Sequence, residues 1–157
     1  MAPRPDQPAG TVVQLMSQIE RRPSASPAVE DDHRTLTIGD LSDRSTRLAN
    51  ALRGLGLEPG DRVAYVAQNH LEYVVLEFAL LKAGLVKVPL NFRLTPQELR
   101  WCMELADVRL AVADSGAAAS LDEVWSEGEV LKVVIGERPG WLGFDALVAS
   151  GDRKSVV

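Results

Sequence analysis

Residues 61–94 carry the clearest pattern of apolar and polar positions in the chain. Val63 and Val66 are β-forming residues, and they follow the turn signal Pro59-Gly60. Apolar residues then recur at the spacing of one helix face, at Leu71, Val74, Val75, Phe78 and Leu81. Residues 85–90 form a short apolar run with little alternation, which predicts a strand covered on both faces. A strand, a crossover helix and a second strand predict a right-handed parallel unit.

Two residues mark the expected ends of this helix. Asn69 is a good N-cap, and Gly84 is placed to end the helix in the left-handed conformation. The remaining side chains of the helix are also apolar, at Tyr73, Leu76, Ala79 and Leu80. We therefore expect this helix to be buried on most sides.

The segment before this unit predicts two helices and a hairpin. Thr11 can cap a helix that runs to about Arg22. Residues 28–30 and 34–37 flank Asp31-Asp32-His33, which predicts a hairpin. Thr37 and Asp40 resemble the capping box that begins another helix.

The segment after the unit continues the alternation of strands and helices. Thr95 and Glu98 form a capping box with proline at the first helical position. Further strands are predicted at 108–113 and 130–135, with helices at 117–124 and 144–149. This order predicts the α/β class, with a mostly parallel sheet and helices on both faces.

Composition narrows the class of protein. The 157 residues are 46% hydrophobic and 25% charged, as in an ordinary globular domain. The net charge of −5 provides no basic footprint, so we expect no nucleic-acid partner. Residues 1–10 contain three prolines and are expected to be a mobile leader. We expect no signal peptide, no membrane span and a cytoplasmic location, because no apolar run reaches about 18 residues.

Several residues that could suggest chemistry have simpler interpretations. Gly54, Gly56 and Gly60 close a helix and precede a strand, whereas a dinucleotide fingerprint has the opposite order. His33 and His70 have no carboxylate or second histidine at a metal-binding spacing. The single cysteine lies on an apolar helix face and excludes an intramolecular disulfide.

Two segments resemble one enzyme family. Residues 80–91, LLKAGLVKVPLN, resemble the second core motif of the adenylate-forming (AMP-dependent) synthetases and ligases. Residues 36–64 resemble the first motif of that family and its sequel, and the likeness extends over roughly 11–148. The following NFRLTPQELRW is more similar to acyl-CoA synthetases (fatty-acid–CoA ligases) than to peptide-synthetase adenylation domains, which usually have Asp-Pro near Asn91. The resemblance implies the N-terminal subdomain of the adenylate-forming enzyme fold.

The resemblance also implies a reaction. Family members activate a carboxylic acid with ATP, release pyrophosphate, and pass the acyl group from the adenylate to a thiol, often that of coenzyme A. They use a Ser/Thr/Gly-rich phosphate loop ending in Pro-Lys-Gly, a glutamate that holds Mg²⁺, and a lysine near the C-terminus, since negative charge gathers at phosphorus. None of these motifs occurs in the chain. We therefore expect no catalytic residue, metal site or bound cofactor in the fragment itself, with ATP, Mg²⁺ and coenzyme A implied for the full-length protein.

One site can be transferred from the family. In acyl-CoA synthetases the loop after the second motif's strand can line the coenzyme A entrance, and here that loop is Asn91, Phe92 and Arg93. Ligands of open α/β sheets bind outside the carboxyl ends of the strands, which agrees with this location. Arg93 could pair with a phosphate, and the alternative is a solvated arginine at a loop tip.

Three hypotheses follow from these observations. In the first, residues 11–150 are a partial domain of an acyl-CoA synthetase, inactive alone, whose partners are the missing C-terminal part, a carboxylic acid and coenzyme A. In the second, the chain is a non-catalytic binding or interaction module. In the third, it is one half of a split ligase that a second polypeptide completes.

Residues 151–157 are expected to be a tail foreign to the family. The last six, Asp-Arg-Lys-Ser-Val-Val, equal the translation of GAT CGG AAG AGC GTC GTG in a widely used short-read sequencing adapter, where the stop codon TAG follows. We predict that these six residues are not biological. Long-read sequencing of the source locus should show a reading frame that continues beyond Gly151. The same six codons and stop in the locus would contradict this prediction.

Overall fold

The computed structural model describes residues 11–125 and 130–154 of the chain. The expected leader, residues 1–10, lies outside the described residues, as do residues 155–157 of the expected tail. In the described part, no helix combines the length and the apolar character needed to cross a membrane.

A parallel sheet forms the centre of the molecule, as the sequence predicts. Its strand order is β4-β3-β5-β6-β7, and every neighbouring pair is parallel. The strands are β3 (Arg62–Val66), β4 (Val86–Pro89), β5 (Val108–Asp114), β6 (Leu131–Ile135) and β7 (Leu142–Gly143). The short β7 was not predicted, because two residues carry no periodic signal.

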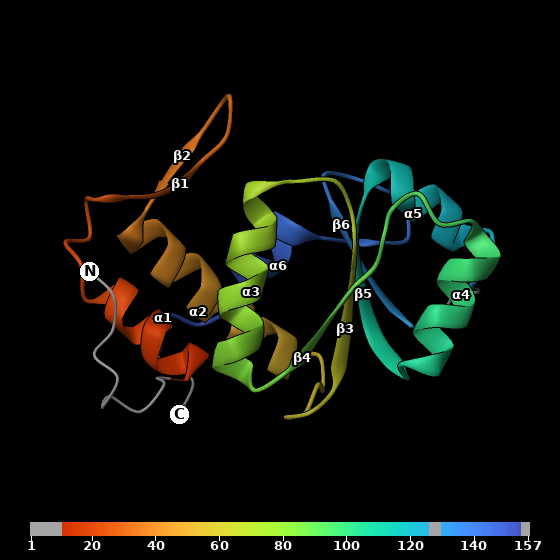
Figure 1. Ribbon diagram of the computed structural model, residues 1–157, viewed down its shortest axis with the longest axis horizontal. Helices are drawn as coiled ribbons and strands as arrows, with labels where there is room; N and C mark the ends of the chain where they lie inside the picture. Colours follow the sequence, from red (N-terminus) through yellow and green to blue (C-terminus); the bar gives the residue numbers. More distant parts are fainter. Residues whose placement is uncertain (1–10, 126–129, 155–157) are drawn as a thin grey trace, which may run out of the picture.

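Helices cover both faces of this sheet (Figure 1). One face carries α2 (Ile38–Gly54), α3 (Leu71–Ala83) and α6 (Phe144–Ser150). The other face carries α4 (Pro96–Leu105) and α5 (Ser115–Asp122). The remaining helix, α1 (Val12–Glu20), packs against α2 and α3 on their outer side. The α/β class with helices on both faces is therefore confirmed.

The side chains of the inner strand β3 alternate between the two layers. In β3, Val63 and Tyr65 belong to the core beneath α2 and α3, while Ala64 and Val66 belong to the core beneath α4 and α5. All four are buried. Successive side chains of a strand point to opposite faces, so a strand covered on both sides needs apolar residues at every position.

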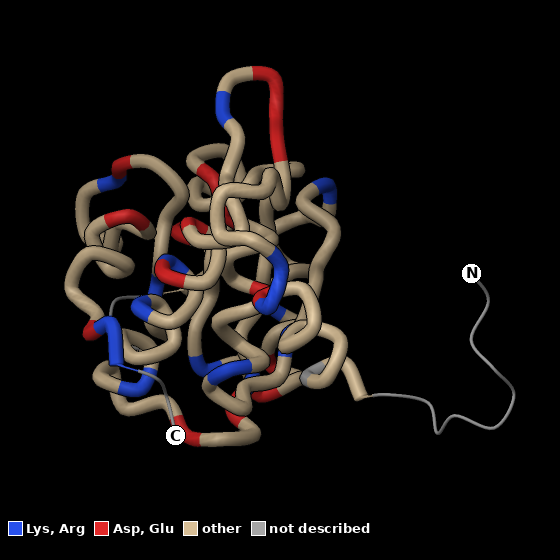
Figure 2. Tube along the Cα trace, turned by 90° about the vertical axis from the view of Figure 1, so that its left-hand side faces the viewer, with Lys and Arg blue, Asp and Glu red and all other residues tan. Residues whose placement is uncertain are grey.

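A separate hairpin stands beside the first turn of α3. Its strands β1 (Pro27–Glu30) and β2 (Thr35–Thr37) pair antiparallel, which confirms the predicted hairpin. Arg34 Nη1 lies 2.9 Å from Oε1 of the buried Glu72, and Nη2 donates to Oε2 at 3.2 Å. Figure 2 shows the acidic stretch of the hairpin at one extremity of the trace, beside a basic position. The ion pair therefore holds the hairpin to α3.

Most of the helix boundaries agree with the sequence. Thr11, Thr37 and Thr95 each form a capping box, in which the side chain of the third helical residue also accepts from the backbone N–H of the cap. Gly84 ends α3 with a φ of 71°, in the left-handed region that favours glycine.

The prediction of Asn69 as an N-cap is wrong. The cap of α3 is His70, which makes no side-chain capping bond, and Asn69 lies exposed before it. Two hydrogen bonds set this loop: Gln68 N donates to Asp114 Oδ2 at 2.9 Å across 46 residues of sequence, and Tyr65 Oη donates locally to Gln68 O at 2.9 Å. Tertiary contacts therefore decide where the helix begins.

The prediction that both faces of β4 are covered is also wrong. This strand lies at the edge of the sheet, and Val86 is 46% exposed. Pro89 is suited to this position, because proline lacks the N–H that an inner strand must donate.

The buried face of α3 differs from the face that the spacing indicated. Val74, Phe78 and Leu81 are only half-buried. The buried residues are Leu71, Glu72, Val75, Leu76, Ala79, Leu80 and Ala83. Because this helix is apolar on nearly all sides, its sequence does not distinguish the inner face from the outer one.

A matched pair of neighbouring leucines tests this assignment. Leu80 is 2% exposed, whereas the adjacent Leu81 is half-buried. Leu80→Ala should lower the free energy of unfolding by about 2–5 kcal/mol, as for a buried leucine. Leu81→Ala should cost clearly less. Urea unfolding of both variants measures the difference, and equal losses would contradict the assigned face.

Candidate functional site

The carboxyl ends of β3, β4 and β5 meet at one edge of the sheet. These strands are neighbours in the order β4-β3-β5 and run in the same direction. The loop after β4 carries the three predicted site residues, Asn91, Phe92 and Arg93, and all three are exposed. The structure therefore places them at the edge where ligands of open α/β sheets bind.

These residues form a tight turn. The backbone N–H of Leu94 donates to Asn91 O at 3.1 Å, which closes a four-residue turn. The backbone N–H of Arg93 donates to the side-chain Oδ1 of Asn91 at 3.0 Å. Asn91 thus closes the turn twice, with Phe92 and Arg93 at its two central positions.

The turn is anchored on both sides. Before it, Leu90 N donates to Tyr65 O at 2.9 Å and ties the loop to β3. After it, Thr95 begins α4, and its N–H donates to Glu98 Oε2 at 2.8 Å. The backbone N–H of Thr95, and next its hydroxyl, lower the pKa of Glu98, so the carboxylate that completes the cap stays ionised.

Arg93 differs from most arginines in the described part of the chain. Its Cζ lies 5.4 Å from the centroid of the Phe92 ring. Arg62 pairs with Asp107, and Arg100 pairs with Glu104 at 2.7 Å. Among the described residues, no carboxylate forms such a pair with Arg93. An unpaired guanidinium presents donors that fit a phosphate or a carboxylate.

A second polar group lies at the same edge and was not predicted as part of a site. Asp114 ends β5, and its carboxylate accepts from Gln68 N and from Ala117 N, each at 2.9 Å. His70 Nε2 lies 3.7 Å from Asp114 Oδ2. Since both oxygens already accept backbone bonds, Asp114 joins the loop after β3 to the start of α5. The Asp114-Ser115-Gly116 run before a helix was the available capping signal.

The surroundings of Asp114 affect two titrating groups. Burial raises the pKa of Asp114, but the N–H groups of Ala117 and Gln68 and the nearby His70 lower it more, so the net pKa lies below its usual value. Burial, and next the charge of Asp114, raise the pKa of Tyr65 well above its usual value. Tyr65 therefore keeps the proton that it donates to Gln68 O.

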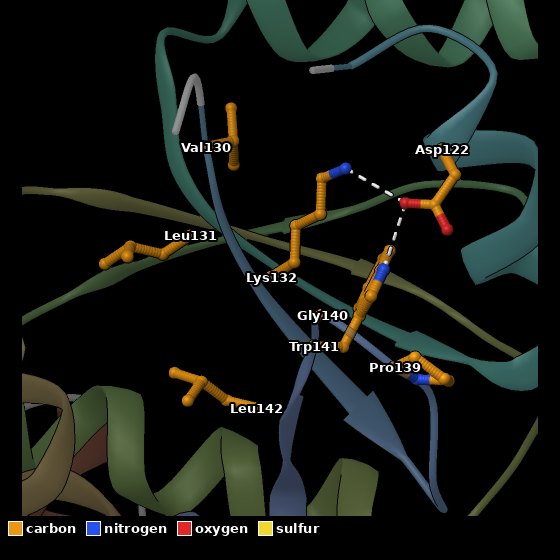
Figure 3. A pocket seen from close by; sticks show the side chains of 8 residues that line it. All are labelled: Asp122, Val130, Leu131, Lys132, Pro139, Gly140, Trp141 and Leu142. Atoms are coloured by element: carbon orange, nitrogen blue, oxygen red, sulfur yellow. Dashed lines mark hydrogen bonds and ion pairs between the residues drawn. The ribbon is translucent and has the colours of Figure 1, made fainter. Parts of the chain in front are cut away.

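A pocket of about 340 Å³ lies elsewhere, at the amino end of β6 (Figure 3). Lys132 Nζ binds Asp122 Oδ1 at 3.0 Å, and Trp141 Nε1 donates to the same oxygen at 3.0 Å. Arg138 Nε donates to Asp122 Oδ2 at 2.7 Å. The residues that line the pocket are Asp122, Val130, Leu131, Lys132, Pro139, Gly140, Trp141 and Leu142.

The carboxylate of Asp122, which accepts hydrogen bonds on both of its oxygens, holds the wall of this pocket together. Burial raises the pKa of Asp122, but the bonds from Lys132, Arg138 and Trp141 lower it more, so the carboxylate stays ionised. Its two oxygens are occupied by three donors, and the group therefore clamps α5 to the segment before β7. The sequence contained no signal for this cluster, since its members are distant along the chain.

The other residues weighed in the sequence lie apart from the edge site. His33 is exposed in the hairpin turn, and Cys102 is half-buried on α4. Within residues 11–125 and 130–154, no group of three or more His, Cys, Asp or Glu side chains could hold a metal ion.

Comparison with known proteins identifies the family. The model of the AMP-binding enzyme family matches residues 15–156. This chain belongs to the AMP-binding enzyme family. A feruloyl-CoA synthase of Amycolatopsis sp is 42% identical over an alignment 128 residues long, which covers 74% of this chain and 24% of that protein. A long-chain-fatty-acid–CoA ligase of Salmonella typhimurium is 32% identical over 126 residues, covering 80% of this chain and 22% of that protein.

Solved structures of the family share the fold. The benzoate CoA ligase from Burkholderia xenovorans superposes with a TM-score of 0.82 at 23% identity. The superposition covers 91% of this chain and 29% of that one. The chain thus spans about a quarter of the length of these curated relatives. The division of the chain at residue 150 stays a prediction.

The charge of Asp114 should make stability depend on pH. Its folded pKa lies below the unfolded value of 3.8, so ionisation stabilises the fold above that value, and the contribution is lost as pH falls through the folded pKa. Asp114→Asn keeps a capping side chain but removes the charge. The wild type should be more stable than this variant at neutral pH, and the difference should shrink in acid below the unfolded pKa. Urea midpoints of both proteins measure this, and a difference independent of pH would contradict it.

Proposed function

We propose that this chain is the N-terminal part of an AMP-forming acid–thiol ligase of the acyl-CoA synthetase type. The family match over residues 15–156 carries the proposal. Named relatives that match over most of this chain are a feruloyl-CoA synthase and a long-chain-fatty-acid–CoA ligase. The reaction joins a carboxylate to the α-phosphorus of ATP and releases pyrophosphate. A thiol then attacks the acyl carbon, and AMP leaves.

Exposed apolar side chains support the view that this chain packs against further protein. Large apolar residues stand exposed on the outer surfaces of α1 and α4: Val12, Leu15, Ile19, Trp101 and Leu105. On each of these two helices the exposed residues recur at the spacing of one face, and a contiguous exposed apolar face is a candidate surface for packing against further protein. The proposal keeps the cytoplasmic location expected from the sequence.

The turn after β4 is the proposed contribution of this chain to coenzyme A binding. Asn91, Phe92 and Arg93 would line the entrance for the cofactor, and Arg93 would bind one of its phosphates. The unpaired guanidinium and its place at the carboxyl edge support this assignment. Coenzyme A supplies the thiol that accepts the acyl group. ATP, Mg²⁺ and the acid are proposed to bind to the rest of the ligase.

The test compares this chain with the longer product of its source locus. We expect residues 1–157 to show only background carboxylate-dependent pyrophosphate exchange, because the chain lacks the family's phosphate loop, metal-binding glutamate and C-terminal lysine. The longer product should exchange pyrophosphate and form a thioester with an aromatic or a fatty acid. Exchange by residues 1–157, or a longer product inactive with every acid of both classes, would contradict the proposal.

A further inference from the structure

We propose that Phe92, within the turn that lines the entrance, is a positioning residue: it holds the Arg93 guanidinium ready for a phosphate monoester, and its effect on phosphate binding acts through that arginine. This inference rests on the proposed coenzyme A role of the turn. Each residue of the turn then has a separate role. Asn91 fixes the backbone, Phe92 holds the side chain of Arg93, and Arg93 binds the anion.

The backbone of the turn is fixed by hydrogen bonds within the chain itself. Asn91 accepts from the N–H of Leu94 through its carbonyl and from the N–H of Arg93 through its side chain. On one side of the turn, Leu90 is hydrogen-bonded to Tyr65 of β3. On the other side, Thr95 is hydrogen-bonded to Glu98 of α4. The two central residues are therefore presented side by side from a fixed base.

The ring of Phe92 makes a cation–π contact with the guanidinium of Arg93. Phe92 is 38% exposed and, among the described residues, belongs to neither core cluster. Its ring centroid lies 5.4 Å from Arg93 Cζ. The ring is thus partly open to solvent and outside both cores, and its contact with the guanidinium is the feature that distinguishes this position.

The ring contact leaves the donors of Arg93 free. A carboxylate partner uses guanidinium N–H groups, as Glu104 uses Nε of Arg100 at 2.7 Å. An aromatic ring attracts the cation through its π-electrons. The contact of the Phe92 ring with Arg93 therefore leaves the N–H donors of the guanidinium available to an anion. Because the side chain is already partly ordered, less conformational freedom is lost when an anion binds. The side chain of Arg93 is thus held by the Phe92 ring, while its N–H donors stay available to an anion.

The experiment uses the complete 157-residue chain labelled with ¹⁵N. Adenosine 3′,5′-bisphosphate is the probe, and the Nε–Hε resonance of Arg93 reports on the side chain. Phe92→Leu removes the ring at similar size, and Phe92→Tyr keeps it. Trp101→Leu is the matched control, because Trp101 is also an exposed aromatic residue, at 63%, and the neighbouring Arg100 is paired with Glu104. All variants should melt at the wild-type temperature.

Phe92→Leu should shift the Arg93 resonance before any ligand is added and weaken probe binding about two- to fivefold, the range of an exposed cation–π contact. Trp101→Leu should leave both unchanged, and Phe92→Tyr, which keeps the ring, should retain tighter probe binding than Phe92→Leu. In an Arg93→Ala background, Phe92→Leu should have no further effect on binding. Coenzyme A should bind like the probe. Weaker binding of 3′-dephospho-coenzyme A and of inorganic phosphate would show that the site takes a nucleotide monoester in preference to other phosphate sources.

Three results would overturn the inference. Equal weakening by Phe92→Leu with and without Arg93 would show that Phe92 contacts the ligand. An unchanged Arg93 resonance in Phe92→Leu would show that the ring does not hold the side chain. Failure of the wild-type chain to bind any phosphate probe would show that Arg93 is not a phosphate-binding residue. The proposed ligase function is tested separately, by the assay of the longer product.

Discussion

Coverage of β3 on both faces is the constraint on which the rest of this structure depends. Val63, Ala64 and Val66 have no exposed surface, and β3 pairs with β4 on one side and β5 on the other. A parallel sheet buried on two faces needs a helical layer on each. The crossover helix α3, with α2 and α6, supplies one layer, and α4 with α5 supplies the other. The connections from β3 to β4, from β4 to β5 and from β5 to β6 each contain a helix, and residues 136–141 join β6 to the short β7 without one.

The same constraint places the candidate site. Because the strands are parallel, every loop that leaves a strand toward a helix emerges at the carboxyl edge. The turn at 91–94, the loop at 67–70 and Asp114 are brought to this edge by β4, β3 and β5 in turn. Each of them leads directly into a helix: Thr95 caps α4 after the turn, His70 is the cap position of α3, and Asp114 itself caps α5. These loops are therefore short. A rigid framework with exposed polar residues at its loop tips is the common arrangement for binding.

The two clusters of charge outside the turn have a structural role. Glu72 is buried and paired with Arg34, and removing one partner would leave an uncompensated charge. Asp122 is likewise surrounded by Lys132, Arg138 and Trp141. Both clusters join segments distant in sequence, the hairpin to α3 and α5 to the region before β7. Arg93 stands apart from them, because its donors remain free in the described structure.

The sequence by itself determined the order of elements, the parallel β3–α3–β4 unit and several helix starts. These features depend on local interactions: Thr11, Thr37 and Thr95 each bond to a residue three positions ahead, and the apolar periods span single elements. Its resemblance to acyl-CoA synthetases also indicated the loop after β4, and the parallel sheet brings that loop to its carboxyl edge. Only the tertiary structure decided the inner face of α3, because a helix apolar on all sides has no periodic signal. It also decided the start of α3, through the bond of Gln68 to Asp114, 46 residues away. The contact of Phe92 with Arg93 joins neighbours in sequence, but it was not predicted, because it depends on the conformation of the turn at 91–94.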